Sequence, residues 1–202
     1  MSHILAEIKI DNYKSIISET FELSAYSPLI GYNNAGKSNI LSAIKWLLRR
    51  TSLQANDYNN PHYPVTIEGR IDGIDDTLLE NILPAHKISI KKYISNGSIQ
   101  IKRVQTIPGE TVAKIKFLIF NPEATSVDSQ WVSNPTGIDN ALNALFPEPI
   151  QIGAMENAEE DVSKSKTTTT IGKLLGEIIE PLETQYGDQV RTVLDGLRSC
   201  LS

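Results

Sequence analysis

The sequence predicts an α/β fold with α+β character, in which a mixed sheet carries an antiparallel hairpin subdomain and helices follow toward the carboxyl end. An apolar run enters a glycine-framed loop and leaves it as an amphipathic helix, which indicates a strand–loop–helix unit. The middle third alternates apolar and polar residues, as half-buried antiparallel strands do. The end of the chain returns to helical spacing, with Leu174, Ile178 and Leu182 among its apolar residues.

The first part of the chain predicts three short strands and a helix. Ile4 to Ile10 alternates apolar and polar residues, Phe21 to Leu23 is a second candidate, and Pro28 to Ile30 runs directly into the glycine loop. After the loop, apolar residues recur every three or four positions, which predicts a helix; they are Ile40, Leu41, Ile44, Leu47 and Leu48.

The middle of the chain predicts a hairpin. Lys87 to Ile94 and Ser98 to Gln105 alternate like strands and are joined by Asn96-Gly97, the preferred pair for a tight turn. The other expected elements are strands at Val65 to Ile71, Ile115 to Phe120 and 150–153, a helix from Asp75 to Leu83 that Pro84 ends, and a helix from Ile138 to Leu145.

The length of 202 residues suits one ordinary domain. We expect a lobe at 1–154 that holds the glycine loop and the antiparallel segment. Residues 155–169 are polar and threonine-rich, which predicts a mobile loop. Residues 170–202 are expected to form an amphipathic helical segment that continues into, or packs on, a second lobe missing from this sequence.

The composition excludes several classes of protein. Hydrophobic residues make up 40% and charged residues 21%, so neither a disordered chain nor a fibrous repeat fits. The single Cys200 excludes an intrachain disulfide and a thiolate-only metal cage. No apolar stretch approaches the roughly 18 residues of a membrane span, and the first residues lack the pattern of a signal peptide. We therefore expect a cytoplasmic protein with no membrane partner.

The glycine loop carries the clearest chemical signal. Gly31 to Ser38 fits the pattern of glycine, four residues, glycine, lysine and serine, between an expected strand and an expected helix. A random chain of this length contains the pattern on the order of once in a hundred. Such glycines let successive backbone N–H groups surround an anion, and the helix dipole favours the same place. Lys37 would reach the β- and γ-phosphates, and Ser38 would ligate Mg²⁺.

Two classes of phosphate-loop protein fit poorly. A GTPase needs an Asn-Lys-x-Asp run to recognise guanine, and the sequence has none. A small nucleotide kinase would place helices and a lid after the loop, whereas strand-like segments follow here.

Two stretches resemble a known family. Ile8 to Ile16, with its Asn-Tyr-Lys-Ser run, and Leu29 to Leu41 resemble the opening of the ABC-type ATPases of the RecF, SMC and OLD group. The Asn-Asn before Ala-Gly-Lys-Ser-Asn and, more weakly, Leu145 to Ile150 and Thr170 to Leu175 are most similar to the OLD nucleases and their relatives in bacterial anti-phage systems. The resemblance spans most of the chain as the amino-terminal lobe of such an ATPase.

The resemblance implies a set of nucleotide-binding residues and the cofactors ATP and Mg²⁺. The implied set is Gly31, Asn33, Asn34, Ala35, Gly36, Lys37, Ser38 and Asn39, together with Lys14. Ser38 is also the implied metal ligand. Lys14 and Ser15 would approach the nucleotide from the Asn-Tyr-Lys-Ser run, although a solvated lysine at the end of a strand explains Lys14 equally well.

The carboxylates that an ABC-type ATPase uses for hydrolysis are not evident. Phe117 to Asp128 resembles the strand that normally ends in Asp-Glu, but Asn121 and Pro122 occupy the two acidic positions, so we interpret the likeness as coincidence. Gln151 and Glu156 are placed where a metal-sensing residue would follow, yet exposed loop residues are the simpler interpretation. The sequence therefore predicts ATP binding and leaves ATPase activity of the isolated chain uncertain.

A basic segment is the candidate DNA surface. Between His86 and Lys116 there are seven Lys and Arg residues against one Glu, in a chain of net charge -5. On the expected hairpin, Lys87, Lys91 and Lys102 would face a phosphate backbone. The alternative is a solvated outer face whose lysines discourage strand pairing.

The leading hypothesis is the ATP-binding lobe of an OLD-like ABC-type ATPase that acts in DNA-directed defence or repair. The resemblance implies a homodimer or higher homo-oligomer with head-to-tail ATPase contacts, and a nuclease as a further domain or a separate subunit. A regulatory or structural ATP-binding module without turnover, and a small P-loop kinase, remain as alternatives.

Overall fold

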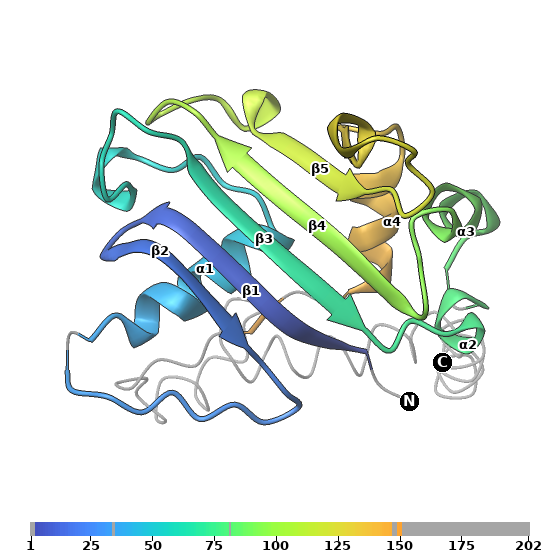
Figure 1. Ribbon diagram of the computed structural model, residues 1–202, viewed down its shortest axis with the longest axis horizontal. Helices are drawn as coiled ribbons and strands as arrows, with labels where there is room; N and C mark the ends of the chain where they lie inside the picture. Colours follow the sequence, from blue (N-terminus) through green and yellow to red (C-terminus); the bar gives the residue numbers. More distant parts are fainter. Residues whose placement is uncertain (1–2, 34, 81, 147–148, 151–202) are drawn as a thin grey trace, which may run out of the picture. The chain divides into compact units, whose positions relative to one another are not determined.

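The computed structural model describes residues 3–33, 35–80, 82–146 and 149–150, which form a six-stranded sheet with helices. The strands follow the order β2-β1-β3-β4-β5-β6, and all five pairings are antiparallel (Figure 1). Their bounds are β1 Ile4–Tyr13, β2 Ile16–Glu22, β3 Val65–Asp72, β4 Ser98–Gln105, β5 Lys116–Phe120 and β6 Trp131–Ser133.

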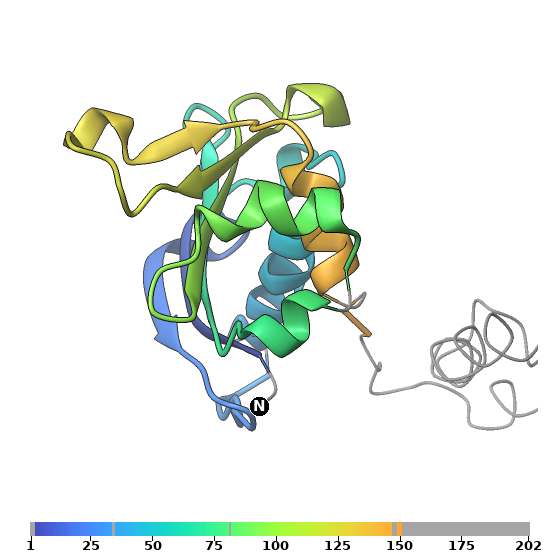
Figure 2. The ribbon, with the colours of Figure 1, turned by 90° about the vertical axis from the view of Figure 1, so that its right-hand side faces the viewer.

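The helices gather on one face of this sheet (Figure 2). The α-helices are α1 Lys37–Leu48, α2 Asp76–Glu80, α3 Pro84–Lys91 and α4 Ile138–Leu145, and the 3₁₀ turns are η1 Ala55–Asp57, η2 Val112–Lys114 and η3 Val127–Ser129. Helix α1 packs against β1 and β3, and α3 packs against α4. None of the described helices is long and apolar enough to cross a membrane.

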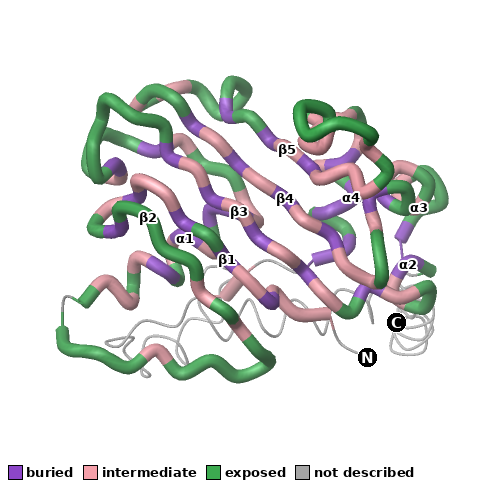
Figure 3. The backbone as a smooth tube through the Cα atoms, viewed as in Figure 1, coloured by how far each residue is buried: buried purple, intermediate pink, exposed green. Residues whose placement is uncertain are grey.

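The core lies between the sheet and these helices. Residues of β3 and β4 alternate between buried and half-buried positions, as Figure 3 shows along both strands. Helix α1 contributes Trp46 and Leu47 to the core, both almost fully buried. A Cβ atom at Gly69 of β3 would lie 2.5 Å from Leu47 Cδ2, so this glycine lets α1 approach the sheet closely.

The structure confirms the α/β class with α+β character, but the described sheet is antiparallel rather than mixed. Pro28 to Ile30 forms no strand, because no neighbouring strand pairs with it and Ile30 is 92% exposed. Phe21 to Leu23 marks only the end of the longer β2, which pairs with β1 as a hairpin. The expected strands that match β3, β4 and β5 and the helices that match α1 and α4 are confirmed.

The prediction of a strand at Lys87 to Ile94 is wrong, although the turn after it is correct. Asn96 and Gly97 both have positive φ, and the N–H groups of Ser95 and Ser98 each donate to the other's carbonyl oxygen. The segment before this turn is the helix α3. Pro84, expected from the sequence to end a helix, lies instead in the first turn of α3, where the missing N–H of proline costs nothing. Helical periodicity, with Ile90 and Tyr93 buried, prevailed over the alternation.

The expected strand at 150–153, apart from Ile150, and the expected loop at 155–169 lie outside the described residues, as does the helical segment at 170–202.

Candidate nucleotide-binding site

The glycine loop leads directly into helix α1. Gly36 takes the N-cap position with φ of 87°, a left-handed conformation that glycine adopts readily. Its carbonyl oxygen accepts hydrogen bonds from the N–H groups of Asn39 (2.9 Å) and Ile40 (3.2 Å). The N–H groups of Lys37 and Ser38 belong to the first turn, where an α-helix offers no internal acceptor. This end of α1 therefore presents backbone donors suited to an anion.

The two motif glycines make room for the loop. A Cβ atom at Gly31 would lie 3.3 Å from Ala35 Cβ, and one at Gly36 would lie 3.1 Å from Ser15 Oγ. A larger residue at Gly36 would suffer this contact in addition to the strain of a positive φ. The close-packed loop fits a phosphate cradle.

Lys37 lies folded across the loop. Its Nζ donates to the carbonyl oxygens of Gly31 (2.6 Å) and Tyr32 (2.7 Å). An ammonium group has three N–H donors, so a third remains for an anion beside the loop. The lysine thereby joins the start of the loop to the start of α1.

The turn between β1 and β2 supports the loop from the other side. Asn39 Nδ2 donates to Ser15 Oγ at 2.8 Å, which connects α1 to this turn. Tyr13 is 3% exposed, and burial raises its pKa to about 12, with a further contribution from the Asp57 charge and a partly opposing hydrogen bond with Ser42 of α1. Tyr13 is therefore neutral at physiological pH and anchors the turn on the helix.

The side chain of Lys14 points to η1. Lys14 Nζ lies 3.6 Å from Asp57 Oδ1, and the Lys14 N–H donates to the Asp57 carbonyl oxygen at 2.9 Å. Lys14 thus precedes Ser15, the residue that contacts Asn39 of α1, and the Lys14 ammonium is paired with the Asp57 carboxylate. Its role at a nucleotide stays a prediction.

A cavity of about 580 Å³ opens beside the loop. Its lining combines Ala35, Gly36 and Lys37 of the loop and the start of α1 with residues of β2, which are mostly apolar but include the carboxylate of Glu19. A polar loop beside apolar side chains suits a ligand that has both a phosphate and a ring system. Asn33 is exposed on the loop, and Asn34 lies outside the described residues.

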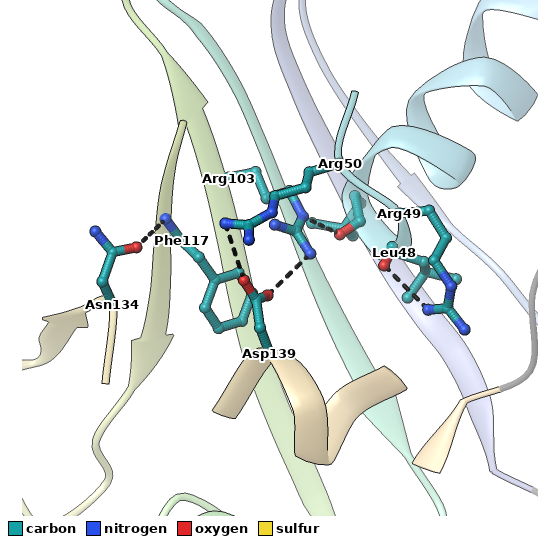
Figure 4. A network of polar contacts seen from close by, with 8 residues as sticks. Leu48, Arg49, Arg50, Arg103, Phe117, Asn134 and Asp139 are labelled. Atoms are coloured by element: carbon teal, nitrogen blue, oxygen red, sulfur yellow. Dashed lines mark hydrogen bonds and ion pairs between the residues drawn. The ribbon is translucent and has the colours of Figure 1, made fainter. Parts of the chain in front are cut away.

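The far end of α1 is fixed by a buried arginine that the sequence analysis missed (Figure 4). Arg103 of β4 is 3% exposed, and its Nε donates to the Leu47 carbonyl oxygen at 2.6 Å. Asp139 of α4 accepts from Arg103 Nη2 at 3.3 Å and pairs with Arg50 Nη1 at 3.2 Å. Burial lowers the pKa of Arg103, and the Asp139 charge opposes that effect. Alternation along β4 places Arg103 on the buried face, which was the available signal.

The three candidate DNA-contacting lysines do not share one hairpin. Lys87 and Lys91 belong to α3 on the helix side, where Lys91 pairs with Asp76 at 3.6 Å. Lys102 belongs to β4, where it pairs with Glu68 at 2.9 Å and lies 3.7 Å above the Trp131 ring. Because residues 84–91 form a helix, the single hairpin face expected to carry these lysines does not form, and DNA binding by them stays a prediction.

Asn121 and Pro122 begin the connection from β5 to β6. The Asn121 N–H donates to the Gln130 carbonyl oxygen at 2.7 Å, and Asn121 Oδ1 accepts from the Glu123 N–H at 3.1 Å. The segment is thus a side-chain-stabilised turn between antiparallel strands. Within the described ranges, no cluster of three or more His, Cys, Asp or Glu side chains could hold a metal ion. A Mg²⁺ ion at the loop would depend on the Ser38 hydroxyl and on phosphate oxygens.

Comparison with known proteins agrees with the loop geometry. The AAA ATPase domain matches residues 4–184. The Old nuclease of Escherichia phage P2 is 40% identical over 185 residues, which are 92% of this chain and 31% of that protein. The chain therefore spans about a third of the length of this relative. Both matches confirm the resemblance to the OLD group that the Asn-Tyr-Lys-Ser run and the glycine loop indicated. The chain belongs to the AAA ATPase domain family.

Proposed function

We propose that this chain is the ATP-binding lobe of an OLD-like ABC-type ATPase. The observation that carries the proposal is the Gly36-capped start of α1, with Lys37 held across the loop by the carbonyl oxygens of Gly31 and Tyr32. Family membership supports nucleotide binding. The identity of the nucleotide as ATP and of the metal as Mg²⁺ is part of the proposal.

The residues of the loop have separate tasks. The N–H groups at the start of α1 bind phosphate oxygens, and the Lys37 ammonium adds a positive charge beside them. The Ser38 hydroxyl would hold Mg²⁺, which when bound neutralises charge between the β- and γ-phosphates. Asn39 keeps the first turn in place through Ser15. The apolar residues of β2 that line the cavity, such as Ile17 and Phe21, would receive the ring system of the nucleotide.

The wider activity is proposed from the relative. The matched protein is called a nuclease, and this chain corresponds to 31% of it, so we propose that the nuclease lies in a further domain or a partner subunit. We also propose a cytoplasmic complex that acts on DNA in defence or repair, with ATP bound between head-to-tail copies. Hydrolysis would then require groups beyond those that the described residues supply.

Isothermal titration calorimetry with ATP, in the presence and absence of Mg²⁺, tests the proposal. We expect Lys37→Ala to weaken binding by at least tenfold, since it removes a charge-assisted contact worth more than about 1.4 kcal/mol. Lys45→Ala is the matched control, because Lys45 lies in the last turn of the same helix. Equal affinity of both variants and the unmodified chain would contradict the proposal.

An ATP-turnover assay separates the alternatives. Binding with negligible turnover by the isolated chain agrees with an incomplete ATPase and with a regulatory module. The same assay on the complete assembly distinguishes the two, because only an incomplete ATPase gains turnover there. Transfer of phosphate to a small acceptor would instead support the P-loop kinase.

A further inference from the structure

We propose that Asp57 is a positioning residue that lowers nucleotide affinity by competing with phosphate for the ammonium group of Lys14. The inference rests on the proposed nucleotide binding and adds a residue outside the glycine loop to it. The observation behind it is the ion pair between Lys14 Nζ and Asp57 Oδ1, next to the turn that contacts the loop.

The carboxylate of Asp57 is held in place. Its Oδ2 accepts a hydrogen bond from the Gln54 N–H at 2.9 Å, and the Asp57 N–H donates to the Gln54 carbonyl oxygen at 2.9 Å. This reciprocal capping arrangement closes the turn η1. Because Oδ2 is used in the cap, Oδ1 is the oxygen that faces Lys14.

The backbone of Lys14 is equally fixed, whereas its side chain can move. The Lys14 N–H donates to the Asp57 carbonyl oxygen, and Asn59 Nδ2 donates to the Lys14 carbonyl oxygen at 2.9 Å. The side chain is 30% exposed and ends in a flexible four-carbon stem. Only the ammonium group can therefore respond to a ligand.

The loop lies close to this lysine. The next residue, Ser15, accepts from Asn39 at 2.8 Å, and its Oγ lies 3.1 Å from the position that a Gly36 Cβ would occupy. A phosphate at the start of α1 would thus come near Ser15, the residue that follows Lys14. The ammonium then has two anionic partners to choose between, the Asp57 carboxylate and the phosphate.

The balance of charge favours the phosphate once it is bound. The Lys14–Asp57 pair is partly exposed, with 30% and 27% of the two side chains accessible, so its stabilisation is small. A polyphosphate carries several negative charges and attracts the ammonium more strongly than one carboxylate does. An ammonium that turns to the phosphate gives up its pair with Asp57, so Asp57 reduces the apparent affinity.

Replacement of Asp57 by Asn tests the proposal, because the amide oxygen can still accept from Gln54 while the charge is removed. We expect the Kd for Mg-ATP to fall about two- to fivefold, the size of one partly exposed ion pair. Affinity for adenosine, which has no phosphate, stays unchanged. Asp76→Asn is the matched control, since Asp76 pairs with Lys91 at the same 3.6 Å distance on α2 and α3.

The variant Lys14→Met identifies the route of the effect. If Asp57 acts through Lys14, the double variant binds Mg-ATP as Lys14→Met alone does. An unchanged or weaker affinity of Asp57→Asn overturns the inference, as does an equal gain in the Lys14→Met background, which would indicate general charge repulsion. Asp57→Ser, whose hydroxyl can also accept from Gln54, provides a second neutral variant if Asp57→Asn fails to fold. Failure of the unmodified chain to bind Mg-ATP would instead refute the proposed function itself.

Discussion

Replacement of Asp139 by Asn removes the shared carboxylate of two arginines. Arg103 is 3% exposed, and without Asp139 its charge keeps only neutral partners such as the Leu47 carbonyl oxygen. Removal of one partner from a fully buried pair costs about 3–5 kcal/mol. The Asp139 side chain is 29% exposed and Arg50 is 40% exposed, so solvent compensates part of this loss. We therefore expect the free energy of unfolding to fall by about 2–3 kcal/mol.

Urea denaturation followed by tryptophan fluorescence, in a Trp131→Phe background that leaves Trp46 as the single tryptophan, measures this change. Trp46 is buried in α1, and its Nε1 donates to the Thr51 carbonyl oxygen, so its emission reports how α1 packs. The corresponding fall in Tm is about 5–10 °C for a domain of this size. Asp76→Asn, in an exposed pair with Lys91, should change stability by less than about 0.5 kcal/mol.

A second substitution separates the buried charge from the lost contact. Arg103→Met removes the charge and keeps an apolar side chain. The double variant Arg103→Met, Asp139→Asn should therefore be destabilised by less than the sum of the two single variants. A loss below about 0.5 kcal/mol in Asp139→Asn, or strict additivity of the pair, would refute the view that Asp139 compensates a buried charge.

Two further predictions concern pH and DNA. The pKa values of Tyr13 and Tyr58 are both raised from 10.0 to about 12, so the folded state keeps protons that the unfolded state loses above pH 10. The free energy of unfolding should therefore be unaffected below pH 10 and decrease as pH rises from 10 to 12. Urea titrations at each pH measure this decrease, which Tyr13→Phe should make shallower. For DNA, changing both Lys87 and Lys91 of α3 to Glu should weaken duplex binding by the complete assembly and reduce its salt dependence. Lys102→Glu should leave binding unchanged, because Lys102 belongs to β4 and not to α3. Equal effects of the two changes would contradict a separate α3 surface.

The glycine loop could be predicted from sequence because its chemistry is local. The spacing of Gly31, Gly36 and Lys37 within eight residues predicts a phosphate loop followed by a helix, so the motif specifies both the residues and the local structure around them. The alternation that begins at Val65 and predicts β3, and the Asn96-Gly97 pair that predicts a tight turn, are local in the same sense. Each depends on residues within one element or one turn.

The errors arose where the outcome depends on tertiary contacts. The run from Lys87 to Ile94 satisfies both strand and helix periodicity, and packing of Ile90 against the core decides for the helix. Pro28 to Ile30 is apolar enough for a strand, but strand assignment needs a partner that the described residues do not provide. The ion pair of Lys14 with Asp57 joins residues 43 positions apart, and no local pattern announces it.

The two ends of α1 explain why side chains rather than backbone are expected to respond to a nucleotide. At its start, Asn39 connects the helix to Ser15. At its end, Arg103 binds the Leu47 carbonyl oxygen, and the shared Asp139 fixes that arginine to α4. Gly69 lets the middle of the helix pack directly on β3. Because α1 is held at three points, we expect a ligand at the glycine loop to redirect side chains: Lys37 from the carbonyl oxygens of Gly31 and Tyr32 and, on the inference above, Lys14 from Asp57.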